Sequence, residues 1–229
     1  MTAEVAPDGR RTAAAARRRR REREIIEATR ALFDARGVRD AQIEDIAQAV
    51  GINRAIIYRH FSGKEELFAL TLVDYLDELH VRLSDADRTE AAPEDRLRAL
   101  TEAFLDYGLE HPAFVDCAMT LMRRTGPELL DEIDEGALFR LGRAIATCLA
   151  RVTEVIRAGV ETGTFHTDDA DLLANTLYAT GLGGLQLARV GMLVKEAAPG
   201  MPVVATLSPA QVKEHLVASS LAMAVGVPG

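Results

Sequence analysis

The chain has 229 residues, which is enough for one large domain or two small ones with a sizeable core. Hydrophobic residues make up 48% of it, Trp is absent, and Ala, Leu, Glu and Arg dominate, a composition that favours helices over sheets. The two cysteines, Cys117 and Cys148, have neither CxxC spacing nor a nearby metal-ligand His, which argues against a disulfide framework or a zinc site. We expect buried, reduced thiols, with a redox-sensing pair as the alternative.

Charge is distributed unevenly along the chain, whose net charge is −8. Residues 1–64 carry 14 Lys and Arg against 9 Asp and Glu, a balance of +5, and the remaining residues have a balance of −13. A basic N-terminal segment followed by an acidic body predicts that the N-terminal segment meets phosphate. The longest uncharged stretch, residues 172–188, is shorter than the roughly 20 apolar residues of a membrane span. We find no signal peptide either, and expect a cytoplasmic protein without a membrane partner.

The first segments of the chain predict a tail and then a helix. Residues 1–16 have no apolar period and are expected to be disordered. A run of arginines at residues 17–23 leads into a helix with Ile25, Leu32 and Phe33 on one face, and Gly37 is expected to end it.

Two short helices are predicted next, at residues 43–50 and 54–60. The turn between them contains Gly51, and Asn53 is a good N-cap for the second helix because its side-chain oxygen can accept from a free amide of the first turn. A capping-box pattern that starts at Ser62 predicts a longer helix to about residue 83.

The remainder of the chain is predicted to be helical. We expect helices at residues 93–110, 113–124, 128–161, 169–192 and 208–224, with capping signals at their starts. An interruption of the third of these at Gly136 is left open. Residues 197–206 contain three Gly or Pro residues and predict a loop. No segment has a convincing strand-like alternation, so the predicted fold class is all-α.

The segment from residue 42 to residue 64 carries the clearest functional signal. Two short helices joined by a Gly-containing turn form a helix-turn-helix, whose second helix can enter the major groove of DNA. Ile57 and Phe61 are expected to face the core, which leaves the other side of that helix for DNA. Arg54 can donate two hydrogen bonds to a guanine, and Ala55 is small enough to approach a thymine methyl group. The candidate DNA-binding residues are Gln42, Asn53, Arg54, Ala55, Tyr58, Arg59, His60 and Lys64.

These residues resemble the DNA-binding domain of the TetR/AcrR family of bacterial repressors. The resemblance covers about residues 20–70 and includes the Ile-Ala pair at Ile46, the Gly-Ile-Asn-Arg turn at Gly51 and the Tyr-Arg-His-Phe sequence that starts at Tyr58. Two positions depart from the family pattern. A Ser or Thr usually caps the first short helix, but Gln42 stands there, so Asp40 is expected to cap instead. A Thr is common where this chain has Ile56, which cannot donate to a phosphate and is either core or a methyl-reading contact.

The resemblance implies an N-terminal three-helix DNA-binding domain at residues 17–64 and a C-terminal helical domain for ligand binding and dimerisation at residues 65–229. A cavity in the middle of that second domain would bind an effector. The candidate ligand-binding residues are Phe104, Tyr107, Cys117, Met122 and Asn175. We find no metal site and no motif for catalysis or for a cofactor, so an enzyme is not expected.

The last two long predicted helices, residues 169–192 and 208–224, are expected to form a homodimer interface. Gly181, Gly183 and Gly184 lie within the first of them, where each costs about 1 kcal/mol relative to Ala, and close approach of a partner helix would offset that cost. The predicted function is a repressor that binds a palindromic operator in double-stranded DNA as a dimer and is released by a small, lipophilic effector. The alternative is a helical small-molecule-binding protein or enzyme that retains a helix-turn-helix shape, and an activator is also open.

Overall fold

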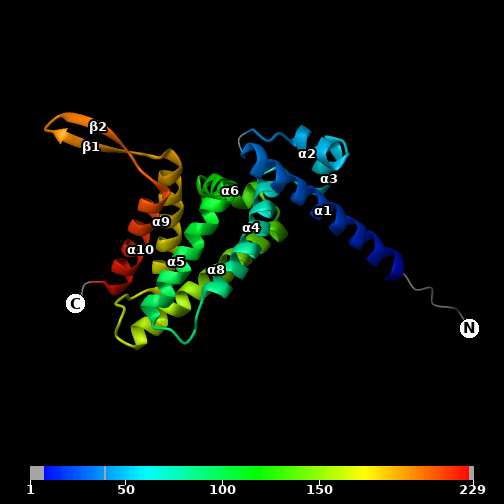
Figure 1. Ribbon diagram of the computed structural model, residues 1–229. Coiled ribbons are helices and arrows are strands. Elements are labelled where there is room, and N and C mark those ends of the chain that lie inside the picture. Colours follow the sequence, from blue (N-terminus) through cyan, green and yellow to red (C-terminus); the bar gives the residue numbers. More distant parts are fainter. Residues whose placement is uncertain (1–7, 39, 227–229) are drawn as a thin grey trace, which may run out of the picture.

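Two groups of helices make up the part of the chain that this computed structural model describes, residues 8–38 and 40–226 (Figure 1). A small group lies at the N-terminal end, and a longer bundle follows it. The elements are α1 (Asp8–Arg36), α2 (Ile43–Val50), α3 (Arg54–His60), α4 (Lys64–Ala86), α5 (Pro93–Glu110), α6 (Pro112–Met122), α7 (Gly126–Glu132), α8 (Glu135–Glu161), α9 (Ala170–Val190), β1 (Met192–Ala198), β2 (Met201–Thr206) and α10 (Pro209–Val225).

The small group, α1 to α3, is built around side chains that the apolar pattern predicts to be buried. Phe33, Ile46 and Ile57 are each 1% exposed, and Phe61 closes the same core. The predicted bounds of α2 and α3 are confirmed. Gly51 has a φ of 71°, the left-handed conformation that a sharp turn between two helices needs and that glycine adopts without strain.

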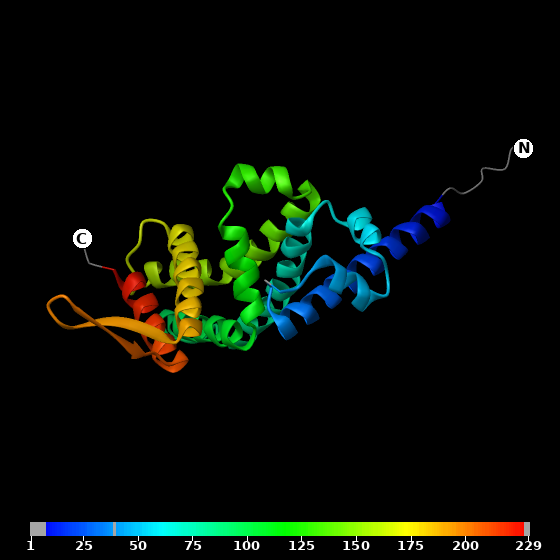
Figure 2. The same ribbon diagram turned by 90° about the horizontal axis from the view of Figure 1, so that it is seen from above.

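Helix α4 joins the small group to the bundle. It begins directly after α3 and packs against α1 at one end and against α5 and α8 along its length. The start of α4 is stabilised by Glu66, whose carboxylate accepts from the backbone N–H and the hydroxyl of Ser62, at 2.6 Å and 2.5 Å. The helix that holds the group of α1 to α3 is therefore also part of the wall of the bundle (Figure 2).

The bundle consists of α4 to α10, with α9 and α10 packed against each other on the side away from α1 (Figure 1). The long helix predicted over residues 128–161 is interrupted at Ile133, and Asp134 caps α8 by accepting from Gly136 N–H at 2.9 Å. Ser208 caps α10 as predicted, with its hydroxyl accepting from Gln211 N–H at 3.2 Å.

No helix of the described residues is long and apolar enough to cross a membrane.

A two-stranded antiparallel hairpin stands where a loop was predicted, so that prediction is wrong at residues 197–206. Strands β1 and β2 pair from Met192 with Thr206 to Ala198 with Met201, and Gly200 forms the turn with a φ of 78°. The hairpin projects from the end of α9 and returns to the start of α10 (Figure 1). The rest of the described fold is helical, as the sequence predicts.

The N-terminal end of α1 also departs from prediction. The helix already begins at Asp8, so residues 8–16 are helical rather than disordered, and residues 1–7 lie outside the described residues. The run of Ala and Arg in this segment consists of strong helix formers. Ion pairs one turn apart, Arg18 with Glu22 at 2.8 Å and Arg20 with Glu24 at 3.1 Å, support the helix further.

Candidate nucleic-acid interface and internal cavity

Helix α3 presents a polar face away from its core. Arg54, Ala55, Tyr58 and Arg59 are exposed, whereas Ile57 is 1% exposed and packs inward. The guanidinium carbon of Arg54 lies 5.8 Å from the ring centre of Tyr58, so the two side chains share one surface. This is the division between core and outer side that the sequence predicts for a helix that enters a major groove.

Arg54 is engaged by an acidic neighbour in the free protein. Its Nη1 donates to Glu44 Oε1 on α2 at 2.7 Å, and the two side chains are 64% and 60% exposed. Such an exposed pair contributes about 0–1 kcal/mol, so a guanine or a phosphate can replace Glu44 at low cost.

The first turns of α2 and α3 are capped by two of the candidate residues. Asn53 Oδ1 accepts from Ile56 N–H at 3.1 Å, which confirms the predicted cap of α3. Gln42 is the N-cap of α2, and its backbone N–H donates to Asp45 Oδ2 at 3.1 Å. The expectation that Asp40 caps α2 is therefore wrong, because a carboxylate three residues after Gln42 satisfies the end of the helix.

His60 and Lys64 are less available than the residues on the outer face of α3. The His60 side chain is 13% exposed, and its Nδ1 lies 3.6 Å from Glu22 Oε1 on α1. Lys64 Nζ lies 5.0 Å from the ring centre of Phe68. His60 thus faces α1, whereas Ile56, at the edge of the exposed face, is half-buried.

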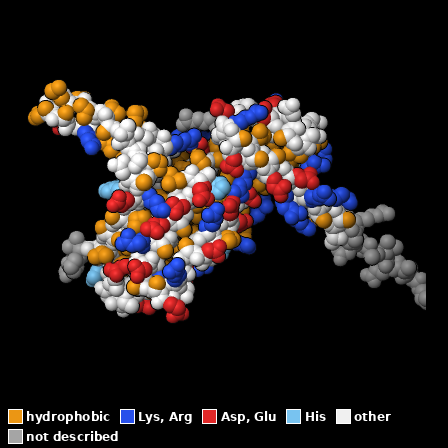
Figure 3. All heavy atoms as spheres, viewed as in Figure 1, with side chains coloured by type: hydrophobic (Ala, Val, Ile, Leu, Met, Phe, Trp, Pro, Cys, Tyr) orange, Lys and Arg blue, Asp and Glu red, His pale blue; other side chains and the backbone are white. Residues whose placement is uncertain are grey.

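The arginine run lies on the part of α1 that extends beyond α2 and α3. Basic side chains gather along this extension (Figure 3), although Arg18, Arg20 and Arg21 have Glu partners on the same helix. An α-helix with its side chains is about 10–12 Å across and cannot enter a minor groove about 6 Å wide. The helix itself therefore cannot enter a minor groove.

A group of ion pairs and hydrogen bonds fixes α1 against α4 and α5. Arg30 on α1 pairs with Asp74 on α4 at 2.7 Å and also with Glu78. Tyr75 on α4 donates to Asp34 Oδ1 on α1 at 2.7 Å, and Tyr107 on α5 donates to the backbone oxygen of Tyr75 at 2.9 Å. Several direct contacts therefore join α4 to α1.

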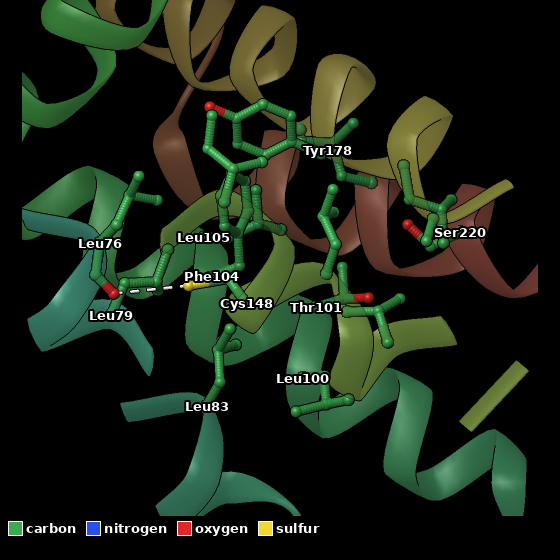
Figure 4. A pocket seen from close by; sticks show the side chains of 17 residues that line it. Leu76, Leu79, Leu83, Leu100, Thr101, Phe104, Leu105, Cys148, Tyr178 and Ser220 are labelled. Atoms are coloured by element: carbon green, nitrogen blue, oxygen red, sulfur yellow. Dashed lines mark hydrogen bonds between the residues drawn. The ribbon is translucent and has the colours of Figure 1, made fainter. Parts of the chain in front are cut away.

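A cavity of about 60 Å³ lies between α4, α5, α8, α9 and α10 (Figure 4). Among the described residues, no charged side chain lines it. Its polar groups are the hydroxyls of Thr101, Tyr178 and Ser220 and the thiol of Cys148, which donates to the backbone oxygen of Leu76 at 3.4 Å. Burial raises the pKa of Cys148 to about 12, so that thiol is uncharged at neutral pH. The lining residues are Leu76, Leu79, Leu83, Leu100, Thr101, Phe104, Leu105, Ile145, Cys148, Leu149, Val152, Ala174, Leu177, Tyr178, Gly181, Leu216 and Ser220.

Of the five candidate ligand-binding residues, the structure places only Phe104 on this cavity. Tyr107 and Cys117 are buried elsewhere, Tyr107 in the contacts that join α5 to α4. Met122 is 51% exposed at the end of α6, and Asn175 is exposed with its amide bonded to the backbone of Asp171. These four lie on helix faces that turn away from the cavity. Sequence reasoning missed Thr101, Tyr178, Cys148 and Ser220, whose signal is a small or polar residue on an otherwise apolar helix face.

Two of the three glycines of α9, Gly181 and Gly184, have a different role from the predicted one. A Cβ at Gly181 would lie 2.6 Å from Phe104, and one at Gly184 would lie 2.3 Å from Leu216. The missing side chains at these two positions thus leave room for side chains from other helices of the same chain. At Gly183 a Cβ would meet no described atom within 4 Å outside its own stretch of helix, so only this one of the three lies on an open surface.

Comparison with known proteins matches this arrangement. Residues 25–71 match the sequence family described as "Bacterial regulatory proteins, tetR family". The activator FasR of Mycolicibacterium smegmatis is 35% identical over 88 residues, 38% of this chain and 40% of FasR. The repressor KstR2 of Mycobacterium tuberculosis is 36% identical over 88 residues, 38% of this chain and 44% of KstR2. The chain thus spans less than half the length of these curated relatives.

Solved structures extend the likeness to nearly the whole chain. The ketosteroid transcriptional regulator KstR2 of Mycobacterium tuberculosis has a TM-score of 0.56 and 26% identity, covering 88% of this chain and 93% of its own. RolR, in a complex with resorcinol, has a TM-score of 0.64 and 18% identity, covering 92% and 90%. At 18% identity the second comparison concerns the fold alone. Residues 25–71 thus match the DNA-binding segment of the tetR family of bacterial regulatory proteins, and the described chain has the helical fold of solved regulators of that family.

Proposed function

We propose that the protein is a ligand-responsive DNA-binding regulator, a repressor that binds a palindromic operator as a homodimer and leaves it when a small effector binds. The exposed face of α3, with Arg54 and Tyr58 side by side, is the observation that carries this proposal. We assign DNA binding to residues 17–64, and effector binding and dimerisation to residues 65–229. Such a regulator acts in the bacterial cytoplasm, on the nucleoid.

Selection from a random DNA library tests the proposal directly. We expect enrichment of a palindrome whose half-sites lie about 34 Å apart or a little more, because a two-fold axis places two α3 helices in successive major grooves. A protein that enriches no sequence would contradict the assignment. A reporter gene placed behind the selected site then distinguishes repression from the activation for which FasR is named.

In the proposed complex Arg54 reads a base. The Arg54→Ala variant should weaken specific binding by roughly 1–3 kcal/mol and relax the preference at one base position. Arg59→Ala, a change at another exposed arginine of α3, serves as the comparison: a phosphate contact there would weaken binding to all sequences alike. Anisotropy titrations against the operator and its single-base variants measure both effects. Unchanged base preference in the Arg54→Ala protein would remove Arg54 from the reading role.

The N-terminal part of α1 is proposed to contact phosphates outside the site that α3 reads. Removing residues 1–20 should lower the affinity for specific and random DNA together, and each lost phosphate contact should reduce the slope of log affinity against log salt by about 0.9. Titrations at several salt concentrations give that slope. If the truncated and full chains have the same slope, the arginines interact only with their Glu partners and with solvent.

The homodimer is proposed to form through α9 and α10. Along α9 an exposed stripe of apolar and small residues consists of Leu172, Ala179, Gly183, Leu187 and Val190. On α10 the exposed face includes Ala218, Ala222 and Val225. Two copies of this surface bury each other around a two-fold axis, which is the commonest symmetry of soluble homo-oligomers.

The effector is proposed to bind in the cavity between α4 and α9. A cavity of about 60 Å³ is small compared with typical ligand sites of about 300–1,000 Å³, so an effector must move the helices apart. Leu76, Leu79 and Leu83 of the wall belong to α4, which continues into the DNA-binding group. Expansion of the cavity therefore displaces α3 and lowers DNA affinity.

The residues that line the cavity also favour an uncharged effector over a charged one. A buried carboxylate without a partner costs far more than an uncharged hydroxyl, and no charged residue in the described part of the chain lines the cavity. We expect a long-chain alcohol to raise the melting temperature and release the operator, and the carboxylic acid of the same length to do neither. Ala174→Phe, which fills the cavity from α9, should remove the response to the alcohol and keep operator binding. An acid that acts as well as its alcohol would contradict this assignment.

A further inference from the structure

The hairpin exposes apolar side chains that the described part of its own chain leaves uncovered. Val194 is 73% exposed and Val204 is 67% exposed, and Met192 and Met201 are each more than half exposed. Figures 1 and 2 both show the tip of the hairpin clear of the helices, and apolar side chains gather on it in Figure 3. An isolated two-stranded hairpin is marginally stable in water at best, so this one needs a surface to pack on.

One face of the hairpin is suited to that packing. Residues paired directly across the two strands share a face, which places Val194 beside Val204 and Met192 beside Thr206. On the opposite face Leu193 and Ala205 are half-buried, and Lys195 is paired with Val203. The face that carries Val194 and Val204 is therefore the freer of the two, and its one charged residue, Glu196, lies toward the tip opposite Pro202.

The position and the charge of the hairpin indicate a second copy of the chain as its partner. It is the direct connection between α9 and α10, the two helices of the proposed dimer interface, so it emerges at one end of that surface. The exposed stripe of α9 runs through Leu187 and Val190 into Met192 and Val194. Lys195 and Glu196 are the only charged residues of residues 192–206. The hairpin therefore has no net positive charge that would attract phosphate. Pro202 lies in β2, where it disfavours the addition of a further strand and leaves face-to-face packing.

We propose that the hairpin is a dimerisation arm that packs the face of Val194 and Val204 against the partner subunit. This inference rests on the proposed dimer of α9 and α10 and extends it. Because the arm of each subunit lies on the other subunit, the interface buries more surface. The two arms also fix the position of one α9–α10 face relative to the other.

The test compares two matched variants by sedimentation velocity over a dilution series. Val194→Lys combined with Val204→Lys places charges on the free face, and Val203→Lys places one on the opposite face. We expect the dimer dissociation constant to rise by at least about a hundredfold in the first variant, because each buried valine contributes about tenfold or more to binding. We expect it to change by less than about threefold in the second variant. Near-UV circular dichroism checks that both are folded.

A photo-crosslinking residue at position 194 gives a second measurement that needs no folded double variant. We expect a covalent product of twice the chain mass on irradiation of the wild-type background. Wild-type dimer affinity in the Val194→Lys, Val204→Lys protein, or crosslinking only within one chain, would overturn the arm. Binding of the wild-type protein to neutral lipid vesicles through residue 194 would overturn it in favour of a membrane. A wild-type protein that is monomeric at every concentration would overturn the proposed dimer itself.

Discussion

The Gly183→Arg protein should sediment as a folded monomer at micromolar concentration and should lose operator binding. Gly183 lies in the middle of the exposed stripe of α9, and a Cβ there meets no described atom within 4 Å beyond its own helix. The arginine therefore fits the monomer, and replacing a glycine within a helix should favour the helix by up to about 1 kcal/mol. In the dimer the same arginine would lie unpaired in an apolar interface, where an isolated charge is very costly.

The effect on DNA binding should be large because two linked recognition helices bind far more tightly than one. Loss of the second half-site should weaken operator binding by about a hundredfold or more. Gly142→Arg is the matched control, since Gly142 is also exposed and open but lies on α8, outside the proposed interface. Sedimentation and anisotropy measure the two consequences separately. A Gly183→Arg protein that remains a dimer and binds DNA normally would show that the subunits meet elsewhere.

The largest effect on stability is expected for Arg96→Ala. The Arg96 side chain is 7% exposed and pairs with the buried side chain of Asp87 through contacts of 2.8 Å and 3.0 Å. Arg151 on α8 reaches the same carboxylate at 3.2 Å. Removing Arg96 leaves a buried charge with one remaining partner and should cost about 3 kcal/mol of folding free energy.

Thermal unfolding and its dependence on pH check this expectation. The midpoint should fall by roughly 6–12 °C at pH 7. Hydrogen bonding to Arg96 lowers the pKa of Asp87, so the pair stabilises the fold above the unfolded pKa of about 3.9, and this is lost as pH falls through the lower folded value. The difference between wild type and variant should therefore shrink below about pH 4. Arg82→Ala, which breaks an exposed pair with Glu110, should cost less than about 1 kcal/mol, and an equal loss in both proteins would contradict the role of burial.

The helix-turn-helix could be predicted from the sequence almost residue by residue because its signals are local. The turn glycine Gly51, the cap Asn53 and the buried Ile57 each act within a few residues of where they stand. The same holds for the cap at Ser208. The orientation of His60 toward α1 could not be predicted in this way, because it depends on Glu22, far away in the sequence.

The cavity and the hairpin were beyond local reasoning for two different reasons. Which helix face lines a cavity depends on how five helices pack, so Phe104 was found and Met122 was misplaced by the same argument from apolar residues. Neither strand of the hairpin shows an alternation of apolar and polar residues, and Pro199 and Gly200 resemble an ordinary loop. Pairing between its two strands, rather than the pattern of either strand, creates it.

The contact between Arg54 and Glu44 has a consequence for how fast an operator is found. A regulator of this kind slides and hops along DNA before it stops, and every contact with a random sequence slows it. While Arg54 remains paired with Glu44 at 2.7 Å, it does little to slow movement along random DNA. A guanine, which offers two acceptors in the right place, favours the exchange of partner more than a single phosphate oxygen does. In the proposed complex, the acidic residue on α2 would therefore keep Arg54 from slowing the search and leave it available to bind at the operator.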